Sequence, residues 1–259
     1  MRKIAFLTIL TALIMTSCCN QSQKEKAAIA KLDTMFQELY PADEPGAAVL
    51  ILKGDEIVYD KGFGIADLET GAKIDGNTFF NIASVSKQFT AVAMLQLAEQ
   101  GKISLQDPVK KYFPEFQADF FNDITIAHLL SHTSGIGDYR PREDRDFVLY
   151  ATDEQCYKYM ETLDKLHFTP GTEYQYMNPT FQLCYIIIQR VTGQSFEQYM
   201  KENIFTPAGM DQTVYFSPDK NIPNMSHAYI PVEEKESASN TDSDRTPEAQ
   251  AAAKKQQES

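Results

Sequence analysis

The sequence predicts an α+β fold with one N-terminal helix, a few strands and many helices. The only clear strand signal lies in residues 47–68, where short β-favouring runs are separated by turn residues. Apolar residues recur at the helical period before this stretch and again after Ser84. The chain has 259 residues and is 43% hydrophobic, so it suits one domain, or a large core with a smaller one beside it.

The charge balance narrows the classes of partner. Lys and Arg together number 24 and Asp and Glu number 36, which gives a formal net charge of -12 at pH 7. An acidic surface lacks the cations that nucleic acid or an anionic membrane surface demands. The composition therefore argues against nucleic acid as a partner.

The first residues have the features of an export signal. Arg2 and Lys3 precede an uncharged apolar run over residues 4–15, which is too short to span a bilayer. The run ends in Met-Thr-Ser before Cys18, and small residues directly before a cysteine resemble the lipobox of bacterial lipoproteins. We therefore expect residues 1–18 to be a lipoprotein-type signal peptide and lipobox. Cys18 would then carry a lipid anchor in a bacterial cell-envelope membrane, facing the periplasm or the exterior. The alternative is an ordinary cleaved signal with two incidental cysteines, which also places the domain outside the cytoplasm.

The elements follow in order along the chain. Apolar spacing predicts a helix over residues 23–39, which Pro41 ends, and Gly54-Asp55 marks a turn between strands. One further helix is predicted to start near Ser84 and to end at Gly101. The later helices are predicted from an N-cap or a capping box at their first residues. The predicted strands cover residues 47–53, 56–59 and 63–68, and the later predicted helices cover 126–131, 179–193 after an Asn178 N-cap, and 199–205 after a Ser195–Gln198 capping box.

The last residues differ in kind from the rest. Residues 233–259 contain no aromatic residue and no Val, Leu, Ile or Met, so little can offset the entropy of ordering them. We expect residues 232–259 to form a disordered polar tail. Cys156 and Cys184 are interpreted as core packing, and no disulfide framework is predicted.

One local pattern is typical of nucleophilic catalysis. Ser84 and Lys87 have the S-x-x-K spacing, which places a hydroxyl and an amine one turn apart on one helix face. A serine hydroxyl is a weak nucleophile at neutral pH and needs a neighbouring base, and a helix N-terminus favours developing negative charge. The alternative is an N-cap serine with a solvated lysine. A second match at residues 217–220 is followed by Asn221 and Pro223 rather than by a helix, and is discarded.

Four motifs in order carry a resemblance to a known family. They are residues 81–91 (N-I-A-S-V-S-K-Q-F-T-A), residues 129–135 (L-L-S-H-T-S-G), Pro170-Gly171 with residues 176–178 (Y-M-N), and residues 207–210 (P-A-G-M). In this order they resemble the β-lactamase-like serine hydrolases, which include class C β-lactamases, D,D-peptidases and related esterases. The resemblance implies an antiparallel sheet flanked by helices plus a helical subdomain.

The resemblance also implies roles for individual residues. Ser84 would be acylated, Lys87 would assist its deprotonation, and Tyr176 would act as the acid/base partner. Asn178 would hydrogen-bond the substrate amide or Lys87. The alternatives are that Tyr176 is an aromatic residue of the core and that Asn178 is a helix N-cap.

Other readings of the polar residues are weaker. His128 and His132 are four residues apart, but Leu129 stands where an H-E-x-x-H zinc site needs its glutamate. We therefore expect no metal. Gly62-Phe63-Gly64 lacks the third glycine of a dinucleotide-binding loop and the sequence has no P-loop, so we also expect no soluble cofactor. The H-T-S-G segment that begins at His132 is interpreted as a structural turn packed beside the site.

The chain departs from the family after Gly209, because no glycine follows that residue. The third family motif, K-T-G or H-x-G on a late strand, is therefore absent. Residues 23–231 are interpreted as a partial domain that is truncated at its C-terminal side, with late strands missing. Two explanations stay open: a truncated or frame-shifted gene product, or a second chain that supplies the missing strands and completes the sheet. Loss of one oxyanion donor would slow turnover by about two to three orders of magnitude.

Two functions remain open from the sequence. The first is a serine hydrolase that acts through an acyl-enzyme on amide, ester or β-lactam bonds of small-molecule or peptide substrates in the cell envelope. The second is a catalytically inactive, hydrolase-like binding protein or a truncated fragment. The substrate is not readable from the sequence.

Overall fold

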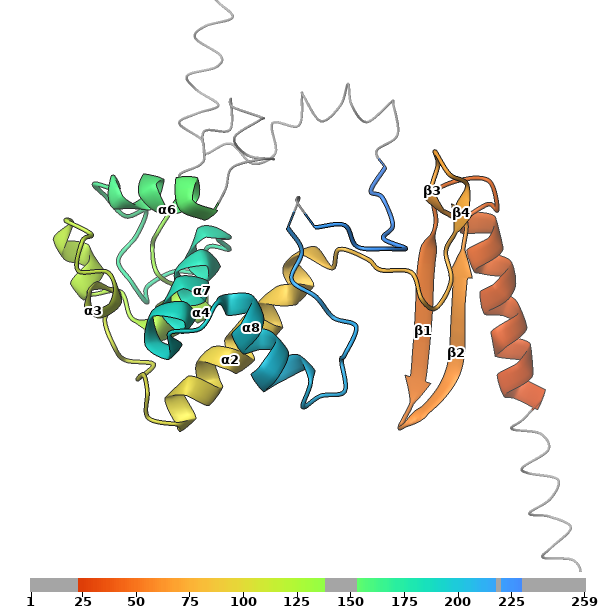
Figure 1. The fold of residues 1–259 in the computed structure, drawn as a ribbon, viewed down its shortest axis with the longest axis horizontal. Helices are drawn as coiled ribbons and strands as arrows, with labels where there is room; N and C mark the ends of the chain where they lie inside the picture. Colours follow the sequence, from red (N-terminus) through yellow and green to blue (C-terminus); the bar gives the residue numbers. More distant parts are fainter. Residues whose placement is uncertain (1–22, 138–152, 218–219, 230–259) are drawn as a thin grey trace, which may run out of the picture. The chain divides into compact units, whose positions relative to one another are not determined.

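The computed structural model describes residues 23–137, 153–217 and 220–229 (Figure 1). The chain forms two compact units, one made of residues up to Asn81 with those from Lys220 onward, the other of Ile82–Asp219. The predicted signal segment with Cys18 and the predicted tail lie outside the described residues. The assignments of residues 1–18 and 232–259 therefore stay predictions.

The first unit is built on a β-hairpin. Strands β1 (Ala47–Lys53) and β2 (Glu56–Phe63) pair antiparallel, with a register shift between Ile51 and Leu52. Gly54 at the turn has a φ of +62°, a conformation that glycine adopts without the Cβ clash of other residues. Two shorter strands, β3 (Ile65–Asp67) and β4 (Ala72–Lys73), form a second antiparallel pair.

The returning strands differ from the prediction of separate runs at 56–59 and 63–68. Strand β2 continues through Gly62 to Phe63, and the chain turns only at Gly64, whose φ is +69°. Gly62 allows the close approach that this path needs, because a Cβ there would lie 2.1 Å from the carbonyl oxygen of Ile74. The sequence predicted that this stretch forms strands, but the position of the turn depends on the close approach of Gly62 to the backbone of Ile74.

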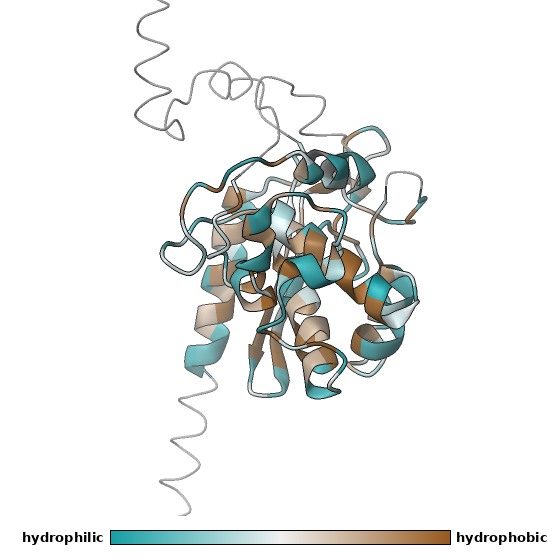
Figure 2. Ribbon diagram, turned by 90° about the vertical axis from the view of Figure 1, so that its left-hand side faces the viewer, coloured by the Kyte–Doolittle hydropathy of each residue, from teal (hydrophilic) through white to brown (hydrophobic). Residues whose placement is uncertain are grey.

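The helix predicted over residues 23–39 is present, and it covers one face of the hairpin. The Phe36 ring lies 5.5 Å from Phe63, centroid to centroid, and Asp33 accepts a 2.7 Å hydrogen bond from Tyr59 and pairs with Lys61. Figure 2 shows hydrophilic and hydrophobic stretches side by side along this helix.

The other face of the hairpin stays open to solvent. Leu50, Leu52 and Ile57 are each more than half exposed, and within the described residues no further strand pairs with β1 or β2. The expectation that late strands of the sheet are missing stays a prediction.

The second unit is helical. Its central helices are α2 (Lys87–Glu99), preceded by the 3-10 turn η1 (Ala83–Ser86), and α7 (Pro179–Thr192). Short elements surround them: α3 (Val109–Tyr112), η2 (Asp119–Asn122), α4 (Ile126–Leu130), α6 (Asp153–Glu161), α8 (Phe196–Met200) and the π-helical turn η3 (Lys201–Phe205). With the strands of the first unit, they make the predicted α+β class.

The core of this unit lies between α2, α4, α7 and α8. Met94 and Leu97 of α2 and Leu183 and Ile187 of α7 are fully buried. Each such side chain contributes about 1.5–3 kcal/mol through removal of apolar surface from water. Cys184 is fully buried in the same core, as expected, and its thiol pKa is raised to about 12 by desolvation.

Two predicted caps need correction. Asn178 occupies the N-cap position of α7, but its backbone is already helical and its side chain makes no capping hydrogen bond. The Ser195 hydroxyl accepts from the Gln198 amide as predicted, whereas the Gln198 side chain reaches Glu202 instead of returning to close the capping box. In both cases the amide side chain hydrogen-bonds a residue outside the cap, which is Lys87 for Asn178 and Glu202 for Gln198.

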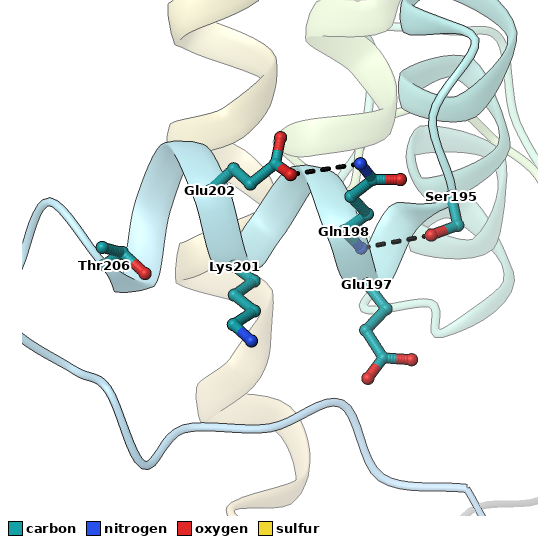
Figure 3. Close-up of a pocket in the computed structure, with 6 residues that line it drawn as sticks. All are labelled: Ser195, Glu197, Gln198, Lys201, Glu202 and Thr206. Carbon is teal, nitrogen blue, oxygen red and sulfur yellow. Dashed lines mark hydrogen bonds between the residues drawn. The ribbon is translucent and has the colours of Figure 1, made fainter.

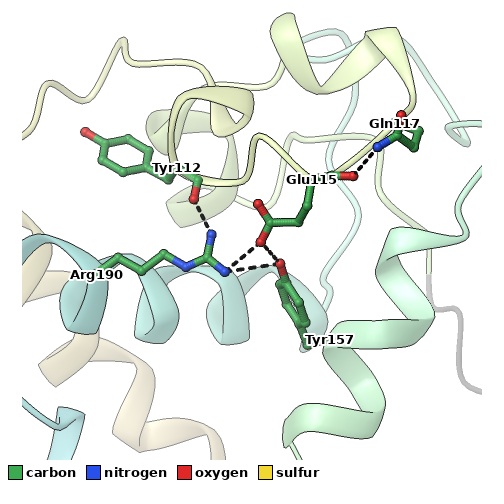
Figure 4. A network of polar contacts seen from close by, with 5 residues as sticks. All are labelled: Tyr112, Glu115, Gln117, Tyr157 and Arg190. Atoms are coloured by element: carbon green, nitrogen blue, oxygen red, sulfur yellow. Dashed lines mark hydrogen bonds and ion pairs between the residues drawn. The ribbon is translucent and has the colours of Figure 1, made fainter.

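A polar network ties α6 and α7 to the segment after α3 (Figure 4). The Arg190 guanidinium donates to the Tyr112 carbonyl and lies 2.7 Å from a carboxylate oxygen of Glu115, which also accepts from the Tyr157 hydroxyl. Desolvation raises the pKa of Glu115, but the hydrogen bonds from Arg190 and Tyr157 outweigh it and lower that pKa to about 2.

None of the helices in the described ranges combines the length and the apolar character that a membrane span requires.

Candidate active site

The S-x-x-K pair lies where a short 3-10 turn leads into helix α2. Ser84 is inside η1 and Lys87 is the first residue of α2, so the hydroxyl directly precedes the helix N-terminus. The Lys87 ammonium donates to Ser84 Oγ at 3.0 Å. Ala83, just before the serine, has a φ of +44°, a strained backbone for a residue with a Cβ.

Two residues from a distant part of the sequence complete a cluster around this pair. Tyr176 donates from its hydroxyl to Ser84 Oγ at 2.7 Å, across 92 residues of sequence. Lys87 also donates to Oδ1 of Asn178 at 2.8 Å. The structure thus brings together all four residues of the domain that were predicted for catalysis and substrate binding.

Aromatic rings face the lysine as well. The Lys87 Nζ lies 5.1 Å from the ring centroid of Tyr176 and 5.7 Å from that of Phe181. Both rings present π-electron density to the ammonium group. Together with its hydrogen bonds to Ser84 and Asn178, these contacts fix the position of the charge beside the serine.

The charge of Lys87 changes the acidity of the neighbouring phenol. Desolvation raises the pKa of Tyr176, but hydrogen bonds with Lys87 and Ser84 and the positive charge of Lys87 outweigh it and lower the pKa below its usual value of 10. Tyr176 therefore reaches the phenolate form at lower pH than a free tyrosine. A phenolate at this position can accept the proton of Ser84.

The cluster is open to solvent on one side. Ser84, Tyr176 and Asn178 are exposed and Lys87 is half-buried. Tyr176 remains 44% exposed although its hydroxyl contacts the serine. A substrate can reach the serine hydroxyl from solvent.

A ladder between two loops places Tyr176. The amides of His167, Gly171 and Gln175 donate to carbonyls of the turn after α4 at 2.8, 2.8 and 2.9 Å. The acceptors are Gly135, Thr133 and His132, in that order. The expected structural turn therefore lies beside the cluster and aligns the loop that carries the phenol.

His132 contacts the Tyr176 segment, which the sequence did not predict. Its ring centroid lies 4.5 Å from that of Tyr176, and its Nδ1 accepts from the Met177 amide at 3.2 Å. Its place in the H-T-S-G segment marked a turn, but no periodic or spacing signal linked it to the Y-x-N segment.

The histidine pair is engaged in contacts other than metal binding. His128 Nδ1 accepts from the Thr125 amide, and the Thr125 hydroxyl accepts from the His128 amide, which makes a reciprocal capping box at the start of α4. Within the described ranges, no group of three or more His, Cys, Asp or Glu side chains is placed to hold a metal ion.

A pocket of about 510 Å³ lies elsewhere in the same unit, along α8 and η3 (Figure 3). None of the four clustered residues lines it, and its serine is used as a helix cap. Its lining is polar, and we regard it as a surface groove between side chains of one helical segment. The lining residues are Ser195, Glu197, Gln198, Lys201, Glu202 and Thr206.

Comparison with known proteins agrees with the motif resemblance. The family described as Beta-lactamase matches residues 32–253, and the chain belongs to this family. Protein flp of Staphylococcus aureus strain MW2 is 33% identical over 202 residues, which cover 76% of this chain and 39% of that protein. Penicillin-binding protein 4* of Bacillus subtilis strain 168 is 31% identical over 214 residues, which cover 77% of this chain and 45% of that protein. The chain thus spans less than half the length of these curated relatives.

Solved structures give the same assignment. A penicillin-binding protein from Bacillus halodurans aligns with a TM-score of 0.67 at 30% identity, over 78% of this chain and 61% of that one. The D-alanine carboxypeptidase AmpC from Burkholderia cenocepacia aligns with a TM-score of 0.64 at 25% identity, over 80% and 55%. The hydrolase EstCE1, described as having promiscuous acyltransferase activity, also gives 0.64 at 25% identity, over 82% and 57%. The predicted family and the α+β class are confirmed.

Proposed function

We propose that this protein is a serine hydrolase that forms an acyl-enzyme at Ser84 and cleaves amide, ester or β-lactam bonds. One observation carries the proposal: Ser84 Oγ lies 2.7 Å from the Tyr176 hydroxyl and 3.0 Å from Lys87 Nζ. Both distances are within hydrogen-bond reach, which a nucleophile needs from its base.

Acylation begins with Tyr176 in its phenolate form. Ser84 Oγ attacks the acyl carbon while its proton passes to the Tyr176 oxygen, and the ammonium of Lys87 stabilises the phenolate before transfer. The protonated Tyr176 then donates to the leaving nitrogen or oxygen as the scissile bond breaks. The products of this half-reaction are the Ser84 ester and the free amine or alcohol.

Deacylation uses the same groups in reverse. A water molecule attacks the ester carbon and gives its proton to Tyr176, and the proton returns to Ser84 Oγ as the ester bond breaks. Asn178 holds Lys87 by accepting one of its N–H groups, at 2.8 Å. The Asn178 side chain is also the group that would hydrogen-bond the amide of a bound substrate.

The substrate class is supported by the names of the relatives. They include penicillin-binding proteins, a D-alanine carboxypeptidase and a hydrolase with acyltransferase activity. All of these names fit acyl-group chemistry. We place the protein outside the cytoplasm, held at a cell-envelope membrane through a lipid on Cys18, on the strength of the pattern in residues 1–18.

The proposal is tested by intact-mass spectrometry of soluble protein without its first 18 residues, after incubation with a penicillin and, separately, with a fluorophosphonate. We expect a single adduct that is absent from the Ser84→Ala variant. Ser86→Ala is the matched control, because Ser86 Oγ donates to the Ala83 carbonyl in the same turn. Folded protein that forms no adduct with either reagent, or an adduct that survives Ser84→Ala, refutes the assignment.

A further inference from the structure

His132 has a backbone conformation that few residues adopt. Its φ is +57°, in the left-handed region that costs non-glycine residues about 1–3 kcal/mol unless the surroundings impose it. It follows directly on the C-cap of α4 at Ser131, where the chain turns toward the loop before α7. Several of its contacts lie on the segment that carries Tyr176.

His132 contacts Tyr176 and both of its sequence neighbours. The His132 carbonyl accepts from the Gln175 amide at 2.9 Å, and His132 Nδ1 accepts from the Met177 amide at 3.2 Å. The imidazole also lies against the Tyr176 ring, with 4.5 Å between centroids. One residue therefore holds both sequence neighbours of the phenol and the phenol ring itself.

We propose that His132 is a positioning residue that holds Tyr176 against Ser84, through its ring contact and through the acceptor nitrogen that it offers to the Met177 amide. The proposal rests on the proposed function, because Tyr176 is its acid/base group. His132 itself touches neither Ser84 nor the bond to be broken.

The contact with Met177 fixes the form of the imidazole. Only an unprotonated Nδ1 can accept a hydrogen bond, so the ring must be neutral with its proton on Nε2. Desolvation lowers the pKa of His132, and the positive charge of Lys87 lowers it further. Both effects keep the ring neutral at neutral pH.

The titratable groups that face His132 come from two elements. Lys87 lies on α2, and Tyr174 and Tyr176 lie on the loop before α7, with ring centroids 6.1 and 4.5 Å from His132. Helix α7 contributes Phe181, which carries no charge, at 5.2 Å. Protonation of Nδ1 would set two N–H donors against each other at Met177, so we expect Tyr176 to lose its placement in acid.

Two substitutions separate the contributions of His132. His132→Asn keeps an acceptor close to the position of Nδ1 and tolerates a positive φ, but removes the ring. His132→Phe keeps a ring and removes the acceptor. His227→Asn, in the other unit, is the matched control for loss of a histidine.

The first measurement does not depend on activity. Nitrogen NMR of ¹⁵N-histidine-labelled protein, with the His132 signal assigned by its loss in His132→Asn, should show an unprotonated Nδ1 at pH 7. The Met177 amide should exchange slowly with solvent in wild type and in His132→Asn, and faster in His132→Phe. A protonated Nδ1, or equal exchange in all three proteins, overturns the proposal.

The second measurement is the rate of Ser84 labelling by a fluorophosphonate between pH 4 and 9. The wild-type rate should fall more steeply with acid below the His132 pKa than above it, and this extra fall should vanish in His132→Asn. His132→Phe should label roughly tenfold more slowly or worse at every pH, since small misplacements at a reacting centre carry such penalties. Identical pH profiles in wild type and His132→Asn overturn the proposal. If no protein is labelled while the NMR and exchange results hold, the hydrolase assignment fails and the positioning of Tyr176 by His132 stands.

Discussion

Tyr176 donates a 2.7 Å hydrogen bond to Ser84 Oγ, and the same phenol faces the Lys87 ammonium 5.1 Å from its ring centroid. The serine is therefore contacted by two groups: a phenol that can take its proton when ionised, and an ammonium whose positive charge stabilises that ionised phenol. This pairing explains how a weakly acidic phenol can serve as a base. It also sets the reactivity expected of variants at each position.

Removal of the phenol hydroxyl should abolish most of the acylation. We expect Tyr176→Phe to slow Ser84 labelling by about 10²–10⁴-fold, the usual contribution of a positioned general base. Single-turnover labelling, followed by intact mass, measures this. Tyr174→Phe, at an exposed tyrosine two residues earlier, should label like wild type. Equal rates in both variants would remove Tyr176 from the mechanism.

The pKa of Tyr176 should depend on Lys87. Because interactions with Lys87 lower that pKa and desolvation raises it, Lys87→Met should move it upward from its present value below 10. The ultraviolet difference spectrum of the phenolate, with Tyr176→Phe as the blank, follows this titration. The wild-type labelling rate should rise as the pH approaches the pKa of Tyr176 and level off above that pKa. A Tyr176 titration that is unchanged in Lys87→Met contradicts the proposed coupling.

Asn178 offers a choice between two roles. As a capping residue, its replacement by Ala would cost about 1 kcal/mol of stability. The structure gives it no capping hydrogen bond and has it accept from Lys87, so we expect Asn178→Ala to keep the stability of wild type within about 0.5 kcal/mol. Labelling of Ser84 should slow by roughly tenfold, in line with loss of a hydrogen bond to a charged group. Urea unfolding measures the stability, and labelling measures the reactivity of Ser84. A destabilised variant with normal labelling would show that Asn178 acts as a helix cap and not in the site.

The Arg190–Glu115 pair should make stability sensitive to acid. The pKa of Glu115 is lowered from its usual value of 4.5 to about 2, so its stabilising contribution is present above pH 4.5 and is lost as the pH falls toward 2. Both side chains are about one-third exposed, so we discount the effect to on the order of 1 kcal/mol. Arg190→Met should flatten the fall of the melting temperature over this range. Lys158→Met, which breaks a pair with Glu154 that solvent screens more strongly, should change that fall much less. An equal acid response in wild type and Arg190→Met would contradict the prediction.

Much of the local structure was readable from the sequence because its causes are local. Strand β1 has the predicted bounds, Ala47–Lys53, and the helix at residues 23–39 ends before Pro41. Gly101 and Gly193 adopt the positive φ expected after a helix, at +69° and +71°. The S-x-x-K spacing likewise placed Ser84 and Lys87 one turn apart, and this holds although Ser84 lies in the 3-10 turn η1 and Lys87 begins α2.

Only the tertiary structure decided what the distant residues do. The sequence left Asn178 as an N-cap or as a partner of the substrate amide or of Lys87, and the structure has it accept from Lys87, 91 residues away, with no capping hydrogen bond. His132 gained its role because the loop ladder brings the turn after α4 against the Y-x-N segment, and no spacing rule connects segments that meet through backbone hydrogen bonds between loops. The sequence determined which groups could perform chemistry, through motif and period. The packing of α2, α4 and α7 decided which of those groups face one another, because contacts between distant segments depend on the summed burial and hydrogen bonding of the whole unit.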